Sequence, residues 1–561
     1  MGHRRAIAIL LAGGATALAA VAFAPRARSQ APVPAPLDAG VAPGATGATG
    51  EATSGANDVA SGDAGVEIVF EEDEASARLT LPVAPADPAA RPAWLAAQLD
   101  AAVRAQPLLA GARVGAAVVD VHDGQTLWSH QAGLPLNLAS VTKIITAAAA
   151  LHTLGGDFRW RTSVLAEARR PGSGVVEGDL FLRGRGDPTL TGAGLRELAQ
   201  AVAWRGVTEV TGDLVVDGSY FDLVDEPPRF ADQPRERAGF RAPIGAASLD
   251  RNAVTVVVVA DPAGAGPARV SIDPPASEYI RLVAPAVATV ATGRTRVHVA
   301  SKVTRTHLEL RVSGQILASD GVTFVRRRID DPARMFGEVF RAALAERGVK
   351  VRGRRIGRGL APPTAVLVAE RASPPLAEVA RAMVKTSDNF LAETILKTVG
   401  AESRTLPPPP AVAPPATWAD GTAAVHRYLV EQAGVPAGSF RLENGSGLFD
   451  ATAVSADAVA RVLVAAWRDF RVGPDLAAAM ATGGVDGTLR RRFTEPALRA
   501  RIRAKTGTLA QVTALAGYAG VDSGRPLAFV VVVNGLTPPA RAQARALQDT
   551  IAMLCVAYTM P

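Results

Sequence analysis

The sequence predicts a mixed α/β (α+β) domain that is assembled from both ends of the chain and interrupted by a large β-rich insertion. Strand-like apolar segments lie near both ends of the globular part, at Arg113–Asp120 and Leu527–Asn534, and are expected to share one sheet. Between them, residues 163–365 contain short alternating segments separated by Gly and Pro, which is typical of inserted β-rich domains. A chain of 561 residues is also longer than one ordinary core.

The first 90 residues are expected to precede the folded domains. Positive charge at residues 3–5 is followed by the apolar residues 6–24, which is typical of a signal peptide spanning residues 1–30, with cleavage between Ala24 and Ala31. Residues 31–90 are rich in Ala, Pro, Gly, Thr and Ser, and we expect a disordered low-complexity tether. The mature protein is therefore expected to be periplasmic or otherwise exported, and no later stretch is apolar for long enough to span a bilayer.

Composition excludes several classes of site and partner. A single cysteine, Cys555, excludes an intrachain disulfide or a cysteine zinc cluster, and the seven histidines show no metal-ligand spacing, so we expect no metal and no cofactor. The net charge of +7 often indicates nucleic acid binding, but an exported protein does not normally meet nucleic acid. An anionic envelope polymer or a membrane surface is the expected counter-charge, and peripheral membrane or homodimer contacts stay open.

The first part of the catalytic domain, residues 91–162, carries a nucleophile and a base on one helix. A hairpin with Gly124 at its turn precedes Ser140-Val141-Thr142-Lys143 and an alanine-rich run. Positions i and i+3 share a helix face, so the Lys143 amine can reach the Ser140 hydroxyl. A serine alcohol needs such an adjacent base to act as a nucleophile.

Two further motifs follow in order in the second part of the domain, residues 366–561. They are Ser387-Asp388-Asn389, expected between two helices, and Lys505-Thr506-Gly507, expected on a strand. Ser-x-x-Lys is weak evidence alone, but the three motifs together are the set of penicillin-binding proteins and class A β-lactamases. A helix at residues 331–347 is expected to lead out of the insertion, and a final helix at residues 539–558 to close the chain.

With these motifs the chain resembles the D-alanyl-D-alanine carboxypeptidase/endopeptidase family of low-molecular-mass class C penicillin-binding proteins, in which a large β-rich insertion separates the first two motifs. Five further segments support the resemblance: residues 184–190, 215–222, 242–249, 444–448 and 484–489. The resemblance covers residues 94–558. It implies a serine β-lactamase/transpeptidase-like fold, cleavage of D-Ala-D-Ala stem peptides or D,D-cross-links of peptidoglycan through an acyl-enzyme, and inhibition by β-lactam antibiotics.

Acyl transfer requires a nucleophile, a base, a proton relay, an anion anchor and an oxyanion hole. Ser140 is expected to be the nucleophile and Lys143 the general base, while Ser387 passes the proton to the leaving amine. Asn389 is expected to orient Lys143 and bind the substrate backbone. Asp388 has either a catalytic role or a role in stabilising its loop.

The third motif is expected to bind the substrate. Lys505 favours the neutral form of Lys143 and, with Thr506, attracts the terminal carboxylate. Gly507 lets the substrate approach the edge strand closely, and the backbone N–H groups of Ser140 and Thr508 form the oxyanion hole. Ser446 and Asp486 match family landmarks, but their glycine neighbours indicate tight turns, so they are left out of this set.

Three alternatives remain at this point. A serine β-lactamase would share the acylation step but would need a glutamate-bearing loop to activate the deacylating water, and no clear match follows the second motif. An esterase would use the same dyad. A catalytically silent peptidoglycan-binding scaffold is disfavoured because every required side chain is present.

Overall fold

The computed structural model describes residues 79–169, 172–234, 236–275, 277–404, 413–520 and 525–560. The expected signal peptide and most of the expected tether lie outside these residues. The structure places the last part of that tether against the domain: the backbone N–H of Leu79 donates to the Glu495 carboxylate at 2.9 Å, and Leu79 and Leu81 pack on the core. The expected tether boundary at residue 90 therefore falls too late, because Leu79 and Leu81 contribute apolar contacts.

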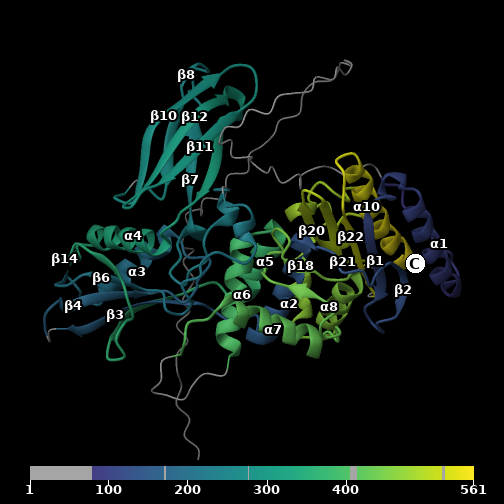
Figure 1. Ribbon diagram of the computed structural model, residues 1–561, viewed down its shortest axis with the longest axis horizontal. Coiled ribbons are helices and arrows are strands. Elements are labelled where there is room, and N and C mark those ends of the chain that lie inside the picture. The colour runs from purple at the N-terminus through teal and green to yellow at the C-terminus, as the bar shows by residue number, and fades with distance from the viewer. Residues whose placement is uncertain are drawn as a thin grey trace, which may run out of the picture. The chain divides into compact units, whose positions relative to one another are not determined.

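A six-stranded antiparallel sheet joins the two ends of the chain, with strand order β19-β20-β21-β22-β1-β2. Its strands are β1 (Arg113–Asp120), β2 (Thr126–His130), β19 (Ala481–Thr482), β20 (Ile502–Leu509), β21 (Val512–Ala519) and β22 (Leu527–Asn534). β1 pairs with β22 along its whole length, and Figure 1 shows the purple β1 beside the yellow-green C-terminal strands. The predicted sheet built from both ends is confirmed.

Helices cover both faces of this sheet. One face packs on α1 (Arg91–Arg104) and α10 (Ala540–Thr559). The other face packs on a helical layer that contains both helical motifs, and Figure 1 shows these helices grouped beside the sheet. The layer consists of α2 (Thr142–Leu154), α5 (Leu376–Thr386), α6 (Asn389–Ser403), α7 (Trp418–Glu431), α8 (Ala456–Arg468) and α9 (Gly473–Ala479), with the short strands β17 (Arg441–Leu442) and β18 (Thr452–Ala453) nearby.

The insertion begins with a seven-stranded sheet packed on two helices. Its members are β3 (Arg161–Arg169), β4 (Val175–Arg183), β5 (Glu209–Val210), β6 (Leu214–Asp217), β14 (Lys350–Val351), β15 (Ile356–Arg358) and β16 (Val366–Ala372), with α3 (Gly192–Trp204) and α4 (Pro332–Glu346). The expected insertion boundary at residue 365 falls too early. β16 follows that residue, yet its backbone pairs with β3, so the inserted sheet closes at Ala372.

Two smaller sheets complete the insertion and share its hydrophobic core. One contains β8 (Gly266–Pro267), β10 (Ile280–Val290), β11 (Arg296–Val303) and β12 (Leu308–Leu317), and the other contains β7 (Ala253–Val259), β9 (Arg269–Asp273) and β13 (Val322–Arg328). Alternating burial along β7 shows one face on the core and one toward solvent, the pattern that the sequence predicted for this region.

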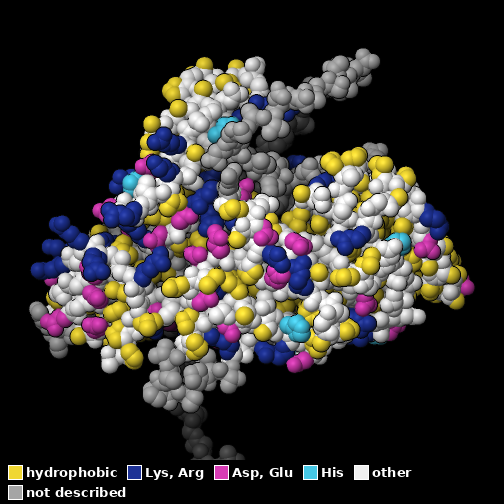
Figure 2. Space-filling view, in the orientation of Figure 1, with side chains coloured by type: hydrophobic (Ala, Val, Ile, Leu, Met, Phe, Trp, Pro, Cys, Tyr) yellow, Lys and Arg dark blue, Asp and Glu magenta, His cyan; other side chains and the backbone are white. Residues whose placement is uncertain are grey.

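Positive charge gathers at one end of the insertion. Figure 2 shows Lys and Arg side chains over the end that carries α4 and β14, and the exposed residues there are Arg347, Lys350, Arg352, Arg354, Arg355 and Arg358.

In the part of the chain that the structure describes, none of the helices combines the length and the apolar character that a membrane span requires. In the same part, no group of three or more His, Cys, Asp or Glu side chains is placed to hold a metal ion.

A buried lysine fastens the insertion to the helical layer. The Lys397 side chain on α6 is fully buried, and its Nζ donates to Asp222 Oδ1 at 2.5 Å and to the Val224 carbonyl at 3.0 Å. The amine also lies over the rings of Phe221 and Trp418, at 5.2 and 4.8 Å from their centroids. Burial lowers the pKa of Lys397, and the Asp222 carboxylate opposes that shift.

Replacing Asp222 with alanine should therefore destabilise the fold. The Lys397 ammonium would keep its burial but lose its counter-charge, so we expect the free energy of unfolding to fall by about 3 kcal/mol. Denaturant unfolding of the purified protein measures this loss. The matched control is Asp232→Ala, which removes an exposed acid from a neighbouring segment and should change stability by less than about 0.5 kcal/mol. Equal effects of the two substitutions would contradict the role of Lys397.

Candidate active site

The first motif places a serine and a lysine at the start of α2. Ser140 lies in the 3₁₀ turn Ala139–Val141 that leads into α2, and Lys143 lies in the first turn of that helix. The Lys143 side chain is fully buried. Its Nζ donates to Ser140 Oγ at 2.9 Å, to Asn389 Oδ1 at 2.8 Å and to the Ser446 carbonyl at 3.0 Å. One amine thus contacts the first motif, the second motif and a loop.

The second motif forms a sharp junction between two helices. Helix α5 ends at Thr386, and Ser387 has left-handed backbone geometry, with φ of 61°. Asp388 caps α6: its Oδ1 accepts from the Leu391 N–H at 3.0 Å, while Oδ2 pairs with Arg251 of the insertion at 2.8 Å. Asn389 is therefore the first residue of α6, where its side chain reaches Lys143. The structural role fits Asp388 better than a catalytic role, because one carboxylate oxygen caps α6 and the other pairs with Arg251.

The third motif runs along β20 beside the nucleophile. Lys505 is fully buried, and its Nζ donates to the Thr506 carbonyl at 2.7 Å. A Cβ added to Gly507 would lie 2.7 Å from the Leu138 carbonyl and 3.2 Å from the Ser140 nitrogen, so only glycine fits at this approach. Thr508, the next residue, pairs with Thr513 of β21. The structure thus brings β20 directly against the Ser140 turn.

A buried glutamate supports the site and was not singled out from the sequence. Glu393 lies on α6, one turn after Asn389, with 1% of its surface exposed. Its two carboxylate oxygens accept the backbone N–H groups of Gly445 and Ser446, each at 2.9 Å. Burial is the largest effect and raises the pKa of the Glu393 carboxyl above its ordinary value, while the hydrogen bonds from these two residues and the charge of Lys143 act in the opposite direction.

Residues 444–447 form a loop, here called the clamp loop, that touches both catalytic helices. Thr146 Oγ1 on α2 donates to the Gly445 carbonyl at 2.7 Å. Gly447 has φ of 74°, and a Cβ on it would lie 2.0 Å from the Ala139 carbonyl oxygen. Asn444 and Ser446 are completely buried. Sequence reasoning interpreted Ser446 as part of a tight turn, whereas its carbonyl contacts the Lys143 amine directly.

Asp486 and Thr488 connect the second and third motifs. Asp486 Oδ2 accepts from Lys385 on α5 at 2.5 Å, and Oδ1 accepts from the backbone N–H of Thr482 at 2.8 Å. Thr506 Oγ1 donates to Thr488 Oγ1 at 2.9 Å. Asp486 and Thr488 both belong to the segment 484–489, which supports the family resemblance, and in the structure they bond to α5, just before Ser387, and to Thr506 on β20.

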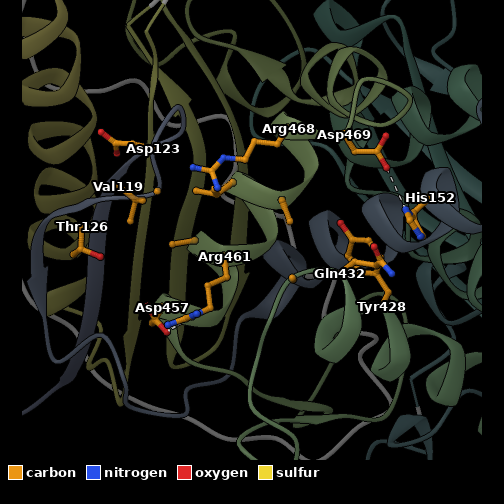
Figure 3. A pocket seen from close by; sticks show the side chains of 15 residues that line it. Val119, Asp123, Thr126, His152, Tyr428, Gln432, Asp457, Arg461, Arg468 and Asp469 are labelled. Carbon is orange, nitrogen blue, oxygen red and sulfur yellow. Dashed lines mark hydrogen bonds and ion pairs between the residues drawn. The ribbon is translucent and has the colours of Figure 1, made fainter.

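A pocket lies away from the three motifs. The pocket in Figure 3 has a volume of about 560 Å³ and is lined by the β1–β2 turn, α7, α8 and the end of α2. His152 in its wall is twelve residues after Ser140, about 18 Å along a helix. Four of its lining side chains form two pairs: His152 with Asp469 at 3.2 Å, and Arg461 with Asp457 at 2.7 Å. The pocket therefore belongs to a different region from the three motifs.

The chain is similar to known peptidases over almost its whole folded length. Residues 95–555 match the D-Ala-D-Ala carboxypeptidase 3 (S13) family. The D-alanyl-D-alanine carboxypeptidase of Actinomadura sp. (strain R39) is 35% identical over 86% of this chain and 90% of the relative. The D-alanyl-D-alanine carboxypeptidase DacB of Haemophilus influenzae is 27% identical over 77% of this chain and 87% of the relative.

A solved structure shows the same fold. The crystal structure of penicillin binding protein 4 from Haemophilus influenzae has a TM-score of 0.65 and 22% identity, covering 80% of this chain and 97% of that protein. The predicted transpeptidase-like fold and the predicted serine carboxypeptidase function are both confirmed. The chain belongs to the D-Ala-D-Ala carboxypeptidase 3 (S13) family of serine peptidases.

Proposed function

We propose that Ser140, activated by Lys143, cleaves the D-Ala-D-Ala bond of peptidoglycan stem peptides through an acyl-enzyme. The observation that carries this proposal is the 2.9 Å contact from the Lys143 amine to Ser140 Oγ, in a buried setting that Asn389 completes. In its neutral form the amine takes the hydroxyl proton as Oγ attacks the carbonyl carbon of the penultimate D-Ala. The C–N bond then breaks, and Ser387 passes a proton to the leaving amine.

The remaining assignments concern the third motif. Lys505 and Thr506 bind the terminal carboxylate, and the N–H groups of Ser140 and Thr508 stabilise the oxyanion. The close approach of Gly507 supports this assignment, because a Cβ on it would lie 3.2 Å from the Ser140 nitrogen and β20 therefore runs directly against the Ser140 turn. Water then hydrolyses the ester and restores the Ser140 hydroxyl. A D,D-cross-link has the same acyl donor, so endopeptidase action needs only a larger leaving group.

β-Lactam antibiotics are proposed inhibitors, because their strained amide acylates the same serine. A structure of the Haemophilus influenzae protein in complex with a novel β-lactam, with a TM-score of 0.62 and 23% identity to this chain, supports this part of the proposal. Export is also proposed: residues 1–30 have the charge and hydropathy pattern of a signal peptide, and peptidoglycan lies outside the cytoplasmic membrane.

The nucleophile is tested by intact-mass analysis with a penicillin, alongside release of D-Ala from a stem pentapeptide. We expect a persistent adduct on the wild type and none on Ser140→Ala, with D-Ala release falling by about 10³-fold or more. Rapid turnover of the penicillin without a lasting adduct would favour the β-lactamase alternative. Hydrolysis of a simple ester without any adduct or D-Ala release would favour the esterase, and complete inertness would favour the scaffold.

Gly447→Ala tests whether the clamp loop sets the nucleophile turn. The new Cβ would collide with the Ala139 carbonyl, so the Ser140 turn or the loop must shift, and we expect penicillin acylation to slow by about 100-fold. Stopped-flow acylation kinetics measure the change. Gly434→Ala is the matched control, because Gly434 has φ of 63° with nothing within 4 Å of an added Cβ. The control carries the backbone strain without the collision and should acylate at the wild-type rate.

A further inference from the structure

Glu393 holds two consecutive peptide groups of the clamp loop from one side. Each carboxylate oxygen accepts one N–H, from Gly445 and from Ser446. The Ser446 hydroxyl also bonds to this carboxyl. Two oxygens on two adjacent amides fix both the position and the tilt of the peptide groups, because a displacement would lengthen one bond or the other.

The carbonyl groups of the same two residues are held from the other side, by the helix that carries the nucleophile. The Gly445 carbonyl accepts from Thr146, and the Ser446 carbonyl accepts from the Lys143 amine at 3.0 Å. The loop backbone is thus held between α6 and α2. A continuous path of contacts runs from Ser140 through Lys143 and the Ser446 residue to Glu393.

We infer that Glu393 is a positioning residue for the general base: through the clamp loop it aims the Ser446 carbonyl at Lys143 and supplies the buried negative charge that stabilises the Lys143 ammonium formed during acylation. This inference rests on the proposed role of Lys143 as the base. In the step itself, the proton moves from Ser140 Oγ to Lys143 Nζ and the Oγ–carbon bond forms. Glu393 gains and loses no proton.

The charge balance of the buried site explains why such a carboxylate is needed. Lys143 and Lys505 are both fully buried, and Asn389, the side chain that faces Lys143 from α6, is neutral. Creating an ammonium there without an anion nearby is costly. Glu393 acts on Lys143 from α6. The two N–H donors and the hydroxyl of the clamp loop, together with the charge of Lys143, favour the ionised carboxylate against the opposing effect of burial.

The test compares wild type with Glu393→Gln by the rate of acylation by a chromogenic cephalosporin, measured as a function of pH. The amide keeps the size of the side chain but removes its charge and points an NH₂ group at a backbone N–H. We expect the plateau rate to fall by about 100-fold. We also expect the acid limb of the pH–rate profile to move to lower pH. The Lys143 ammonium would lose its counter-charge, so Lys143 would stay neutral at lower pH.

Three further variants separate this role from packing. Glu393→Asp keeps the charge and should keep the acid limb at its wild-type position. Thr146→Val breaks the other side of the clamp without changing charge, and should lower the plateau while leaving the limb in place. Glu443→Gln is the matched control, since that acid lies beside the clamp loop but pairs with the surface residues Arg229 and Arg441, and it should behave as wild type.

The outcomes decide separately on the two proposals. If wild type forms no adduct at Ser140, the proposed function fails. If wild type is acylated and Glu393→Gln matches its rate and pH profile, this inference alone is overturned. A Glu393→Gln protein with a lowered plateau and an unmoved acid limb also overturns it, because the carboxylate would then only support packing. If that variant does not fold, the limb position in Glu393→Asp decides: a wild-type position supports the inference, and a displaced one overturns it.

Discussion

The burial of the Lys143 amine is the constraint on which the site depends. An amine in an apolar core is tolerated only when oxygen atoms surround its N–H groups. The acceptors here come from Ser140 one helical turn away, from Asn389 on α6 and from the Ser446 backbone. Three segments far apart in the sequence must therefore converge on one nitrogen. The run of small residues 147–150 on α2 lets its neighbours pack closely enough for this convergence.

The insertion is part of this arrangement rather than an appendage. Residues 250–252 have φ values of 49°, 57° and 49°, a left-handed conformation that costs about 1 kcal/mol for each non-glycine residue. The buried Asn252 side chain holds the turn through bonds to the Pro243 carbonyl and Ser248 Oγ. The strained turn presents Arg251 to Asp388, the residue that caps α6 and so places Asn389. The same helix is fastened further along by Lys397 and Asp222.

The sequence was sufficient to predict those parts of the site that depend on local patterns, such as residue spacing along a helix or a strand. Ser140 and Lys143 follow from helical spacing, and the sheet follows from two apolar strands near the ends. Glu393 could have been found from the sequence, because it is an acid among apolar residues of α6 and lies one helical turn after Asn389. The role of the Ser446 carbonyl could not have been predicted in this way, because every residue has a backbone carbonyl and no sequence pattern marks this one. β16 was assigned to the wrong domain since its pairing with β3 is a long-range contact.

The buried acid Glu393 and the base Lys143 both bond to the backbone of Ser446, and this connection has a chemical consequence. A carboxylate in direct contact with Lys143 would hold that amine as an ammonium, which has no lone pair to accept the Ser140 proton. An apolar neighbour would instead leave the ammonium formed during acylation without support. Asn389 and the Ser446 carbonyl place neutral dipoles in contact with the amine, and Glu393 lies behind the loop peptide. Glu393 therefore acts on Lys143 through the Ser446 peptide, and its charge favours the ammonium that Lys143 becomes as the acyl bond is made.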